Sequence, residues 1–395
     1  MNKPRKRATI ALALSFVAVL VVGAFVVTRQ SSHSARKAQL GGPPTSTGAG
    51  FSSATVSHGV YIANFFAPVD PTLLSNENVD GSSQAYKWSA LERNKGVFRW
   101  TRMDSDLKTA QRLGKRIALG IDTGAFTPGW AKPQALTFVV SSHNGKFARG
   151  TTDSIPIPWD ATYEANVRDV ANAVADHLRA TGLYGVVSQV KLTGINEDSE
   201  ETRMPTEGRI PIAYLDGKPV TNTFTTDATS VWRAHGYTRA LVENAWETMA
   251  GYWATAFPDK TLALPTILNA GFPNIDANGA VLSGKETGTN AQTSQYLVDY
   301  AVRRWGKRFM SMHTSLSDLY TAANQWLQVR AYSEGASIGY QFNDLLFGQV
   351  STTPETRFLT GANIGLRFHM SYVEVFRTDP RLYPTTMAKL HAALN

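Results

Sequence analysis

The sequence predicts a single (β/α)8 barrel, an α/β fold, and three observations support this prediction. From about residue 56 onward, short runs with β-strand character alternate with stretches whose apolar residues recur at helical spacing. The alternation yields eight strands, the number that a closed parallel barrel needs. No Gly-rich phosphate-binding loop follows the first strand, so a doubly wound sheet is the second choice. We find no internal repeat and no second folded domain.

The expected elements follow one another along the chain in a regular order. Strands are expected at residues 59–68, 84–91, 116–122, 187–195, 261–267, 308–313, 336–342 and 371–376. Helices are expected at residues 101–113, 163–181, 232–257, 292–305, 316–334, 354–368 and 385–394. Residues 202–229 have few periodic apolar side chains, and we expect them to form a long loop over the mouth of the barrel.

A hydrophobic segment precedes the barrel. Residues 8–27 contain no charged side chain and follow a short basic run. Twenty helical residues rise about 30 Å, the thickness of a membrane's hydrocarbon core. Residues 1–28 are therefore predicted to be a signal anchor or a signal peptide, and the poor cleavage site at residues 33–35 favours the anchor. Because the basic side stays in the cytoplasm, the barrel is expected to be extracytoplasmic, either anchored or secreted.

A linker then leads into the barrel. Residues 29–55 are rich in Gly, Ser, Thr and Pro and have no apolar periodicity, so they are predicted to be flexible. Residues 56–395 form the predicted catalytic domain. The sequence does not indicate the oligomeric state.

Charge and composition narrow the classes of partner. The formal net charge is +8, but residues 1–50 carry seven Lys and Arg and no Asp or Glu. The rest of the chain is therefore nearly neutral, which argues against a nucleic-acid partner and leaves residues 8–27 as the only expected membrane contact. The chain has no cysteine, which excludes disulfides, thiolate metal sites and a cysteine nucleophile. No histidine spacing suits a catalytic metal, and we expect neither metal nor cofactor.

Polar residues gather where the predicted strands end. In a (β/α)8 barrel the active site lies at the carboxyl ends of the strands. The fourth strand leads into Asn196 and Glu197 and then into an acidic run that includes Glu200 and Glu201, while the third strand ends at Asp122. These carboxylates are therefore predicted to share the mouth of the barrel.

Several motifs near these strand ends occur together. The second strand carries Trp88, and Glu92, Gly96, Phe98, Trp100 and Asp104 follow, in the pattern W-x-x-x-E, G-x-aromatic-x-W and an Asp that opens a helix. After the third strand comes T-P-x-W, formed by Thr127, Pro128 and Trp130. Together with Asn196-Glu197, these motifs resemble the retaining glycoside hydrolases whose (β/α)8 barrels carry an Asn-Glu pair at the end of strand four. The β-galactosidase-like members of that clan are the most similar.

The resemblance implies roles for the Asn-Glu pair. Glu197 would be the general acid/base, because a glycosidic oxygen leaves only when it is protonated as the bond breaks. Asn196 would hydrogen-bond to the 2-hydroxyl group of the sugar. Glu200 and Glu201 remain alternatives for the catalytic acid, and Glu201 is also a candidate ligand of the substrate.

The second carboxylate departs from the clan's pattern. A Glu is expected on strand seven, where this chain has Gln341, and an amide cannot form a glycosyl ester. Glu374 on strand eight is the first substitute, because an acid in an apolar run needs a function or a partner such as Arg367 or Arg377. Asp344 and Asp122 are further candidates. Without this second acid assigned, the mechanism could be retaining or inverting.

Other residues are expected to bind the substrate. Trp88 and Trp130 lie near the predicted mouth, where aromatic rings can stack on sugars. His313 ends strand six and is expected to face the same mouth. The sequence thus predicts a glycosidase acting on an extracellular or cell-surface glycan. The alternatives are a catalytically silent carbohydrate-binding barrel, favoured by Gln341, and a barrel lyase or epimerase that uses Glu197 as a proton acceptor.

Overall fold

A computed structural model describes residues 56–139, 152–205, 213–215, 218–220, 228–266, 271–273, 275, 280, 288–321, 325–342 and 355–395. The predicted anchor and linker and Asp344 lie outside these residues. None of the helices in this described part of the chain is both long and apolar enough to cross a membrane.

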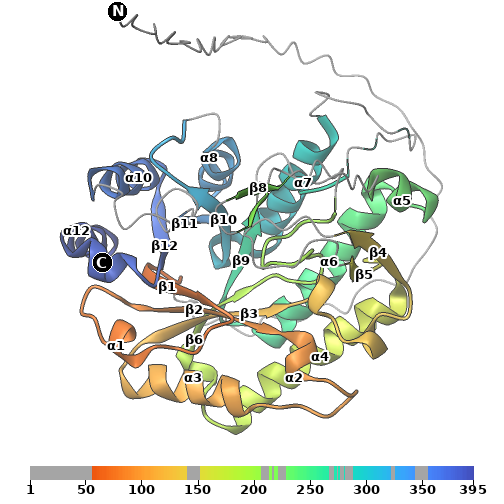
Figure 1. The fold of residues 1–395 in the computed structure, drawn as a ribbon, viewed down its shortest axis with the longest axis horizontal. Coiled ribbons are helices and arrows are strands. Elements are labelled where there is room, and N and C mark those ends of the chain that lie inside the picture. The colour runs from red at the N-terminus through yellow and green to blue at the C-terminus, as the bar shows by residue number, and fades with distance from the viewer. Residues whose placement is uncertain are drawn as a thin grey trace, which may run out of the picture. The chain divides into compact units, whose positions relative to one another are not determined.

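Eight parallel strands close into a barrel, as the sequence predicts (Figure 1). In ring order they are β1 (Gly59–Phe65), β2 (Gly81–Lys87), β3 (Arg116–Asp122), β6 (Val187–Lys191), β9 (Thr261–Thr266), β10 (Phe309–Leu316), β11 (Ser337–Phe342) and β12 (Met370–Phe376). Because each strand pairs with its neighbour in the chain and β12 pairs with β1, no barrel edge is left open.

Helices ring the outside of the barrel (Figure 1). The longer ones are α3 (Thr101–Arg112), α4 (Ala161–Ala180), α6 (Arg239–Ala256), α7 (Gly288–Trp305), α8 (Trp326–Ser333), α10 (Glu355–Arg367) and α12 (Pro384–Leu394). Shorter helices are α1 (Pro71–Leu74), α2 (Trp88–Leu91), α5 (Ala228–Ala234) and α11 (Asp379–Leu382). Single 3-10 turns are η1 (Gly124–Phe126), η2 (Gly129–Ala131), η3 (Tyr184–Val186) and η4 (Gly306–Arg308). Two hairpins lie outside the barrel: β4 (Ala135–Val139) with β5 (Thr152–Pro156), and β7 (Ala213–Leu215) with β8 (Lys218–Val220).

Helix α4 shows how local sequence signals set an element's bounds. Asp160 caps its N-terminus by accepting hydrogen bonds from the backbone amides of Thr162 and Tyr163, both at 2.9 Å. Gly182 ends it with a φ of 71°, a conformation that suits glycine. The apolar residues at helical spacing are buried against the barrel. The helix lies within two residues of the predicted one.

Several predicted elements differ from the structure: for example, the strand predicted at 187–195 ends at Lys191, and the helix predicted at 232–257 is divided into α5 and α6. The predicted second strand, 84–91, is shifted: β2 ends at Lys87, and the next four residues form the helical turn α2. The turn buries Trp88, which a continuing strand would have carried past the barrel. The predicted helix 316–334 is shorter in the structure: β10 continues to Leu316, and α8 begins at Trp326.

The barrel interior changes character along its axis. Alternate residues of each strand point inward. One inward layer is apolar, with Tyr61, Ala118, Ala263, Met310, Met312 and Tyr372 packed together. Toward the mouth the inward side chains become polar and charged, and these include Ser83, Asp122, Lys191, Gln341 and Glu374. The polar layer positions the candidate site.

One position at the base tests how tightly the interior is packed. A Cβ atom on Gly81 would lie 2.4 Å from both the carbonyl oxygen of Arg116 and the ring of Tyr61. We therefore expect Gly81→Ala to destabilise the protein by about 1–3 kcal/mol, since the backbone of β3 must move. Gly185→Ala is the control, because a Cβ atom there meets nothing within 4 Å. Urea unfolding of both variants measures the effect, and equal stabilities would contradict the packing described.

Candidate active site at the mouth of the barrel

The loop after β6 is held in shape by the amide of Asn196. Its oxygen accepts hydrogen bonds from the hydroxyl of Thr123 at 2.7 Å and from the backbone amide of Gly194 at 3.0 Å. Its nitrogen donates to the carbonyl oxygens of Glu200 and Glu201, at 3.1 and 3.0 Å. The side-chain amide of Asn196 therefore forms its hydrogen bonds within the protein. The sequence had instead predicted that it contacts the sugar.

The loops after β3 and β6 are locked together through their backbones. The amide of Ala125 donates to the carbonyl oxygen of Glu197 at 2.8 Å. Gly124 has a φ of 58°, and a Cβ atom there would lie 2.0 Å from the carbonyl oxygen of Asn196. Only glycine fits both conditions. These contacts therefore hold the loop that follows Asp122 and the loop that carries Glu197 in one fixed arrangement.

Glu197 lies beside a cation. The Nε of Arg203 is 3.3 Å from the Glu197 carboxylate, and its terminal nitrogen also pairs with Asp198. The side chain of Glu197 is 15% exposed, whereas Asp198 and the guanidinium are nearly buried. A cation this close favours the charged form of a carboxyl group. Glu197 is therefore suited to act as an ionised carboxylate that solvent can reach.

Asp122, the last residue of β3, lies in an environment that favours the neutral form of its carboxyl group, in contrast to Glu197. It is 1% exposed, and its Oδ1 has no hydrogen-bond partner among the described residues. Burial is the main cause that raises the pKa of Asp122 to about 7; Lys191 and Lys87 oppose this shift, whereas Glu201 and Asp198 support it. A carboxyl group that exchanges its proton near pH 7 can serve as a general acid or base.

A closed ionic network fills the interior below the mouth. The ammonium of Lys191 pairs with Glu200 and, at 2.9 Å, with Glu374, and it donates to the hydroxyl of Ser83 at 2.8 Å. The amide nitrogen of Gln341 donates to both carboxylates, at 2.9 Å to Glu200 and 2.8 Å to Glu374. The hydroxyl of Tyr372 donates to Glu374 at 2.7 Å.

The network has one cation for two carboxyl groups. Burial and the neighbouring Glu374 raise the pKa of Glu200 to about 8, although Lys191 opposes this shift. The two carboxylates raise the pKa of Lys191 despite its burial, so the ammonium stays charged. The raised pKa of Glu200 favours its protonated form, which lowers the negative charge that Lys191 must balance.

Three predicted site residues lie elsewhere than expected. Glu374 is completely buried and both of its oxygens are bonded, so it is a counter-ion of Lys191, whereas we predicted an arginine partner or a catalytic role. Trp88 is buried, with its indole nitrogen on Glu92 at 2.8 Å, and offers no face to a sugar. His313 packs against Tyr340 on the helix-facing side of β10, because its position has the opposite parity to Met312.

The other predicted residues lie near the mouth. Trp130 is half-buried, edge-on to Trp88 at 5.9 Å, with its indole nitrogen 3.3 Å from the carbonyl oxygen of Glu92. Glu201 is half-buried beside Asp122, and its carboxylate contributes to the raised pKa of that residue. Gln341 faces the interior, where its amide bridges two acids. Nowhere in the described residues are three or more His, Asp or Glu side chains arranged to bind a metal ion.

Sequence reasoning missed the cations and one aromatic group. Lys191 is the only charge in the run VVSQVKLTGI, and this was the available signal of a buried charge with a function or a partner. The Nζ of Lys87 lies 4.6 Å from the ring centre of Phe66 and 4.4 Å from that of Phe126. Phe66, just after β1, is 37% exposed and offers an aromatic surface at the rim.

Comparisons with known proteins show the fold. No protein-family model and no curated protein matches the sequence. Among solved structures, the catalytic domain of β-amylase from Paenibacillus polymyxa is 11% identical, with a TM-score of 0.53, over 82% of this chain and 94% of that one. A psychrophilic glycoside hydrolase family 10 endo-β-1,4-xylanase is 11% identical, with a TM-score of 0.44, over 81% and 86%. A xylanase from Thermoanaerobacterium saccharolyticum, in complex with xylotetraose, is 13% identical, with a TM-score of 0.42, over 81% and 85%. The first of these supports the (β/α)8 barrel.

The buried network predicts a large loss of stability when its cation is removed. We expect Lys191→Met to lower the free energy of unfolding by about 3–5 kcal/mol, since it leaves buried carboxyl groups without a counter-ion. Arg168→Met is the control, because the Arg168–Asp169 pair is about half exposed and should contribute less than about 1 kcal/mol. Guanidinium unfolding measures both, and a Lys191→Met variant as stable as the control would show that the network does not stabilise the barrel.

The raised pKa of Asp122 predicts how stability depends on pH. Folding raises this pKa from 3.8 to about 7, so the folded chain binds a proton that the unfolded chain has lost in this window. The contribution of Asp122 to stability is therefore full below pH 3.8 and falls as the pH rises toward 7.

We accordingly expect Asp122→Asn to stabilise the protein at pH 8 by on the order of a few kcal/mol and to change little at pH 4. Thermal unfolding between these pH values tests the expectation, with the exposed Asp169→Asn as the control. A variant that is less stable than the wild type at pH 8 would contradict it.

Proposed function

We propose that this chain is a glycoside hydrolase whose reaction takes place between Asp122 and Glu197. The observation that carries the proposal is the contrast between these two carboxyl groups on backbone-locked loops. Burial gives Asp122 a pKa of about 7, whereas Arg203 favours the ionised form of Glu197. Glycoside hydrolysis needs such a pair, one group to donate a proton and one to remain charged.

In this mechanism Asp122 protonates the departing glycosidic oxygen. Glu197 either attacks the anomeric carbon or activates the water that does so. This division reverses the role that the sequence motif implied for Glu197, since a carboxylate beside a guanidinium is a poor proton donor. Phe66 supplies an exposed ring on which a sugar can stack.

Two finer points belong to the same proposal. The motifs around Trp88–Glu92 and Asn196–Glu197 favour a β-galactosidase-like member of the clan. The basic run before residues 8–27 favours an extracytoplasmic barrel that meets a cell-surface or extracellular glycan.

A second candidate function is a carbohydrate-binding barrel without catalysis. The observation that favours it is Gln341, which stands on the seventh strand and whose amide is committed to the interior network. Both functions bind glycans, so cleavage separates them.

The test is cleavage of a panel of plant, bacterial and exopolysaccharide glycans, measured as new reducing ends. We expect Asp122→Asn and Glu197→Gln each to lower the rate about a hundredfold or more while glycan binding survives. Asp169→Asn, on the exposed face of α4, should leave the rate unchanged. The wild-type rate should fall above about pH 7 as Asp122 loses its proton.

Each result that would contradict the hydrolase proposal points to a different function. Binding without any cleavage by the wild type would establish the binding barrel. An unsaturated product that absorbs in the ultraviolet would indicate a lyase. Proton NMR of the first product gives its anomeric configuration and separates retention from inversion.

A further inference from the structure

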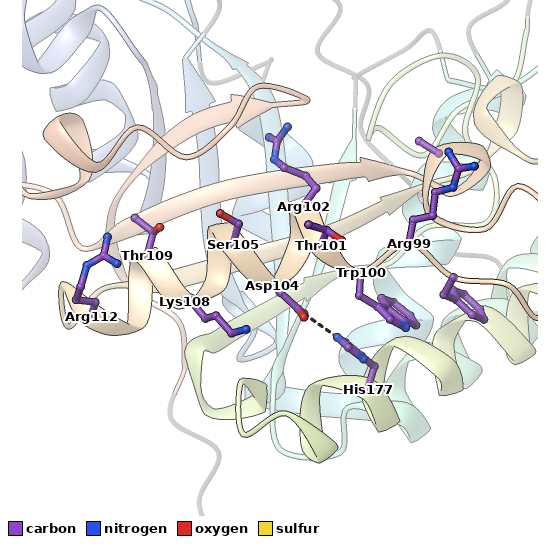
Figure 2. Close-up of a pocket in the computed structure, with 12 residues that line it drawn as sticks. Arg99, Trp100, Thr101, Arg102, Asp104, Ser105, Lys108, Thr109, Arg112 and His177 are labelled. Carbon is purple, nitrogen blue, oxygen red and sulfur yellow. Dashed lines mark hydrogen bonds and ion pairs between the residues drawn. The ribbon is translucent and has the colours of Figure 1, made fainter.

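A groove on the outer face of the barrel runs along α3, away from the interior network. It has a volume of about 1070 Å³, and its walls come from the segment before α3, from α3 itself and from His177 of α4 (Figure 2). Because α3 follows β2 and runs back down the barrel, the groove begins on the mouth side, next to the turn that carries Glu92.

The basic side chains of the groove differ in whether they are paired. Arg102 is neutralised by Asp106 at 2.6 Å, and Asp104 is bonded to His177 at 2.7 Å. In the described part of the chain, no carboxylate pairs with Arg99, Lys108 or Arg112, and all three are exposed. The barrel residues are nearly neutral overall, so these three unpaired cations, one just before α3 and two on it, form a local positive field.

The spacing of these cations favours a polymer over a small anion. Figure 2 shows Arg99 at the N-terminal end of α3 and Lys108 and Arg112 toward the other end. Lys108 and Arg112 are about one helical turn apart, and Arg99 precedes the first residue of α3, a helix about 18 Å long at about 1.5 Å per residue that ends at Arg112. Cations in such a row do not converge on one phosphate, but they can each meet a charge of an extended polyanion.

The aromatic groups of the groove argue against single-stranded nucleic acid. Trp100 is stacked between Phe98, at 4.5 Å, and His177, at 4.1 Å, with the rings nearly parallel. Both faces of the indole are therefore covered, whereas proteins that bind single strands need free aromatic faces for the bases. The groove can recognise charge and shape but offers no indole face for base stacking.

We propose that the groove along α3 is an accessory binding site for an anionic glycan, a polymer of sugar units that bear carboxylate or phosphate groups. Arg99, Lys108 and Arg112 contact the charges, and the stacked Phe98, Trp100 and His177 form the rigid wall against which the chain lies. The site is separate from Asp122 and Glu197, so it binds whether or not the mouth cleaves.

The experiment measures binding of the full-length protein to polygalacturonate, whose sugar units carry carboxylates, and to a phosphomannan, whose sugar units carry phosphates. Dextran is the neutral control, and an oligothymidylate represents nucleic acid. We expect at least one of the two anionic polymers to bind, with an affinity that falls as salt is raised, and dextran not to bind at this groove.

The variant Arg99→Gln/Lys108→Gln/Arg112→Gln should weaken this binding by about tenfold or more and reduce its salt dependence. The matched control is Arg303→Gln/Lys307→Gln/Lys389→Gln, which removes three exposed cations from other elements and should bind within about twofold of the wild type. All six positions are exposed, so both variants should unfold at the wild-type temperature.

Comparison of the two anionic polymers identifies the charged group that is recognised. The proposal is overturned if neither polymer binds, if the two triple variants weaken binding equally, or if the oligothymidylate binds more tightly than both. Asp122→Asn should bind the polymers as the wild type does, so failure at the mouth and failure at the groove are distinguishable.

Discussion

The charge of Lys191 inside the barrel is the constraint on which the rest of the site depends. An ammonium cannot be buried in a protein without partners, and the partners here come from three segments: Ser83 on β2, Glu374 on β12 and the loop residue Glu200. Gln341 on β11 donates to both of these carboxyl groups. Glu200 is the decisive one, because it lies beyond β6 and turns back into the interior. The ion pair between Glu200 and Lys191 holds the loop that carries Glu197 against the barrel interior.

The position of that loop sets the electrostatics of the mouth. The acidic run crowds Asp122 with negative charge, while Arg203 supplies positive charge on the side of Glu197. The two carboxyl groups are thus driven toward different protonation states by surroundings that the interior network holds in place. The protonation states of Asp122 and Glu197 therefore depend on the ionic network around Lys191 in the barrel interior.

The sequence was sufficient for the barrel because strand and helix periodicity repeats eight times, so an error of a few residues in one element does not change the fold. Elements shifted where packing overrode local pattern, as at Trp88, whose burial ends β2 early. Glu374 was recognisable as an acid that needs a partner, but the partner is 183 residues away in the chain and only barrel closure brings it near. For His313, the direction of the side chain depended on strand parity, which becomes visible only once the register of β10 is fixed.

The contact between Ala125 and Glu197 separates two tasks within a single residue. The carbonyl oxygen of Glu197 belongs to the frame that joins the loops after β3 and β6, and its carboxylate belongs to the site. Side-chain exchange at this position therefore leaves the frame intact, whereas any residue larger than glycine at position 124 would break it without touching a reactive group. Substitutions of side chains at this mouth can consequently change its specificity, whereas a change in the backbone of one loop requires a matching change in the other.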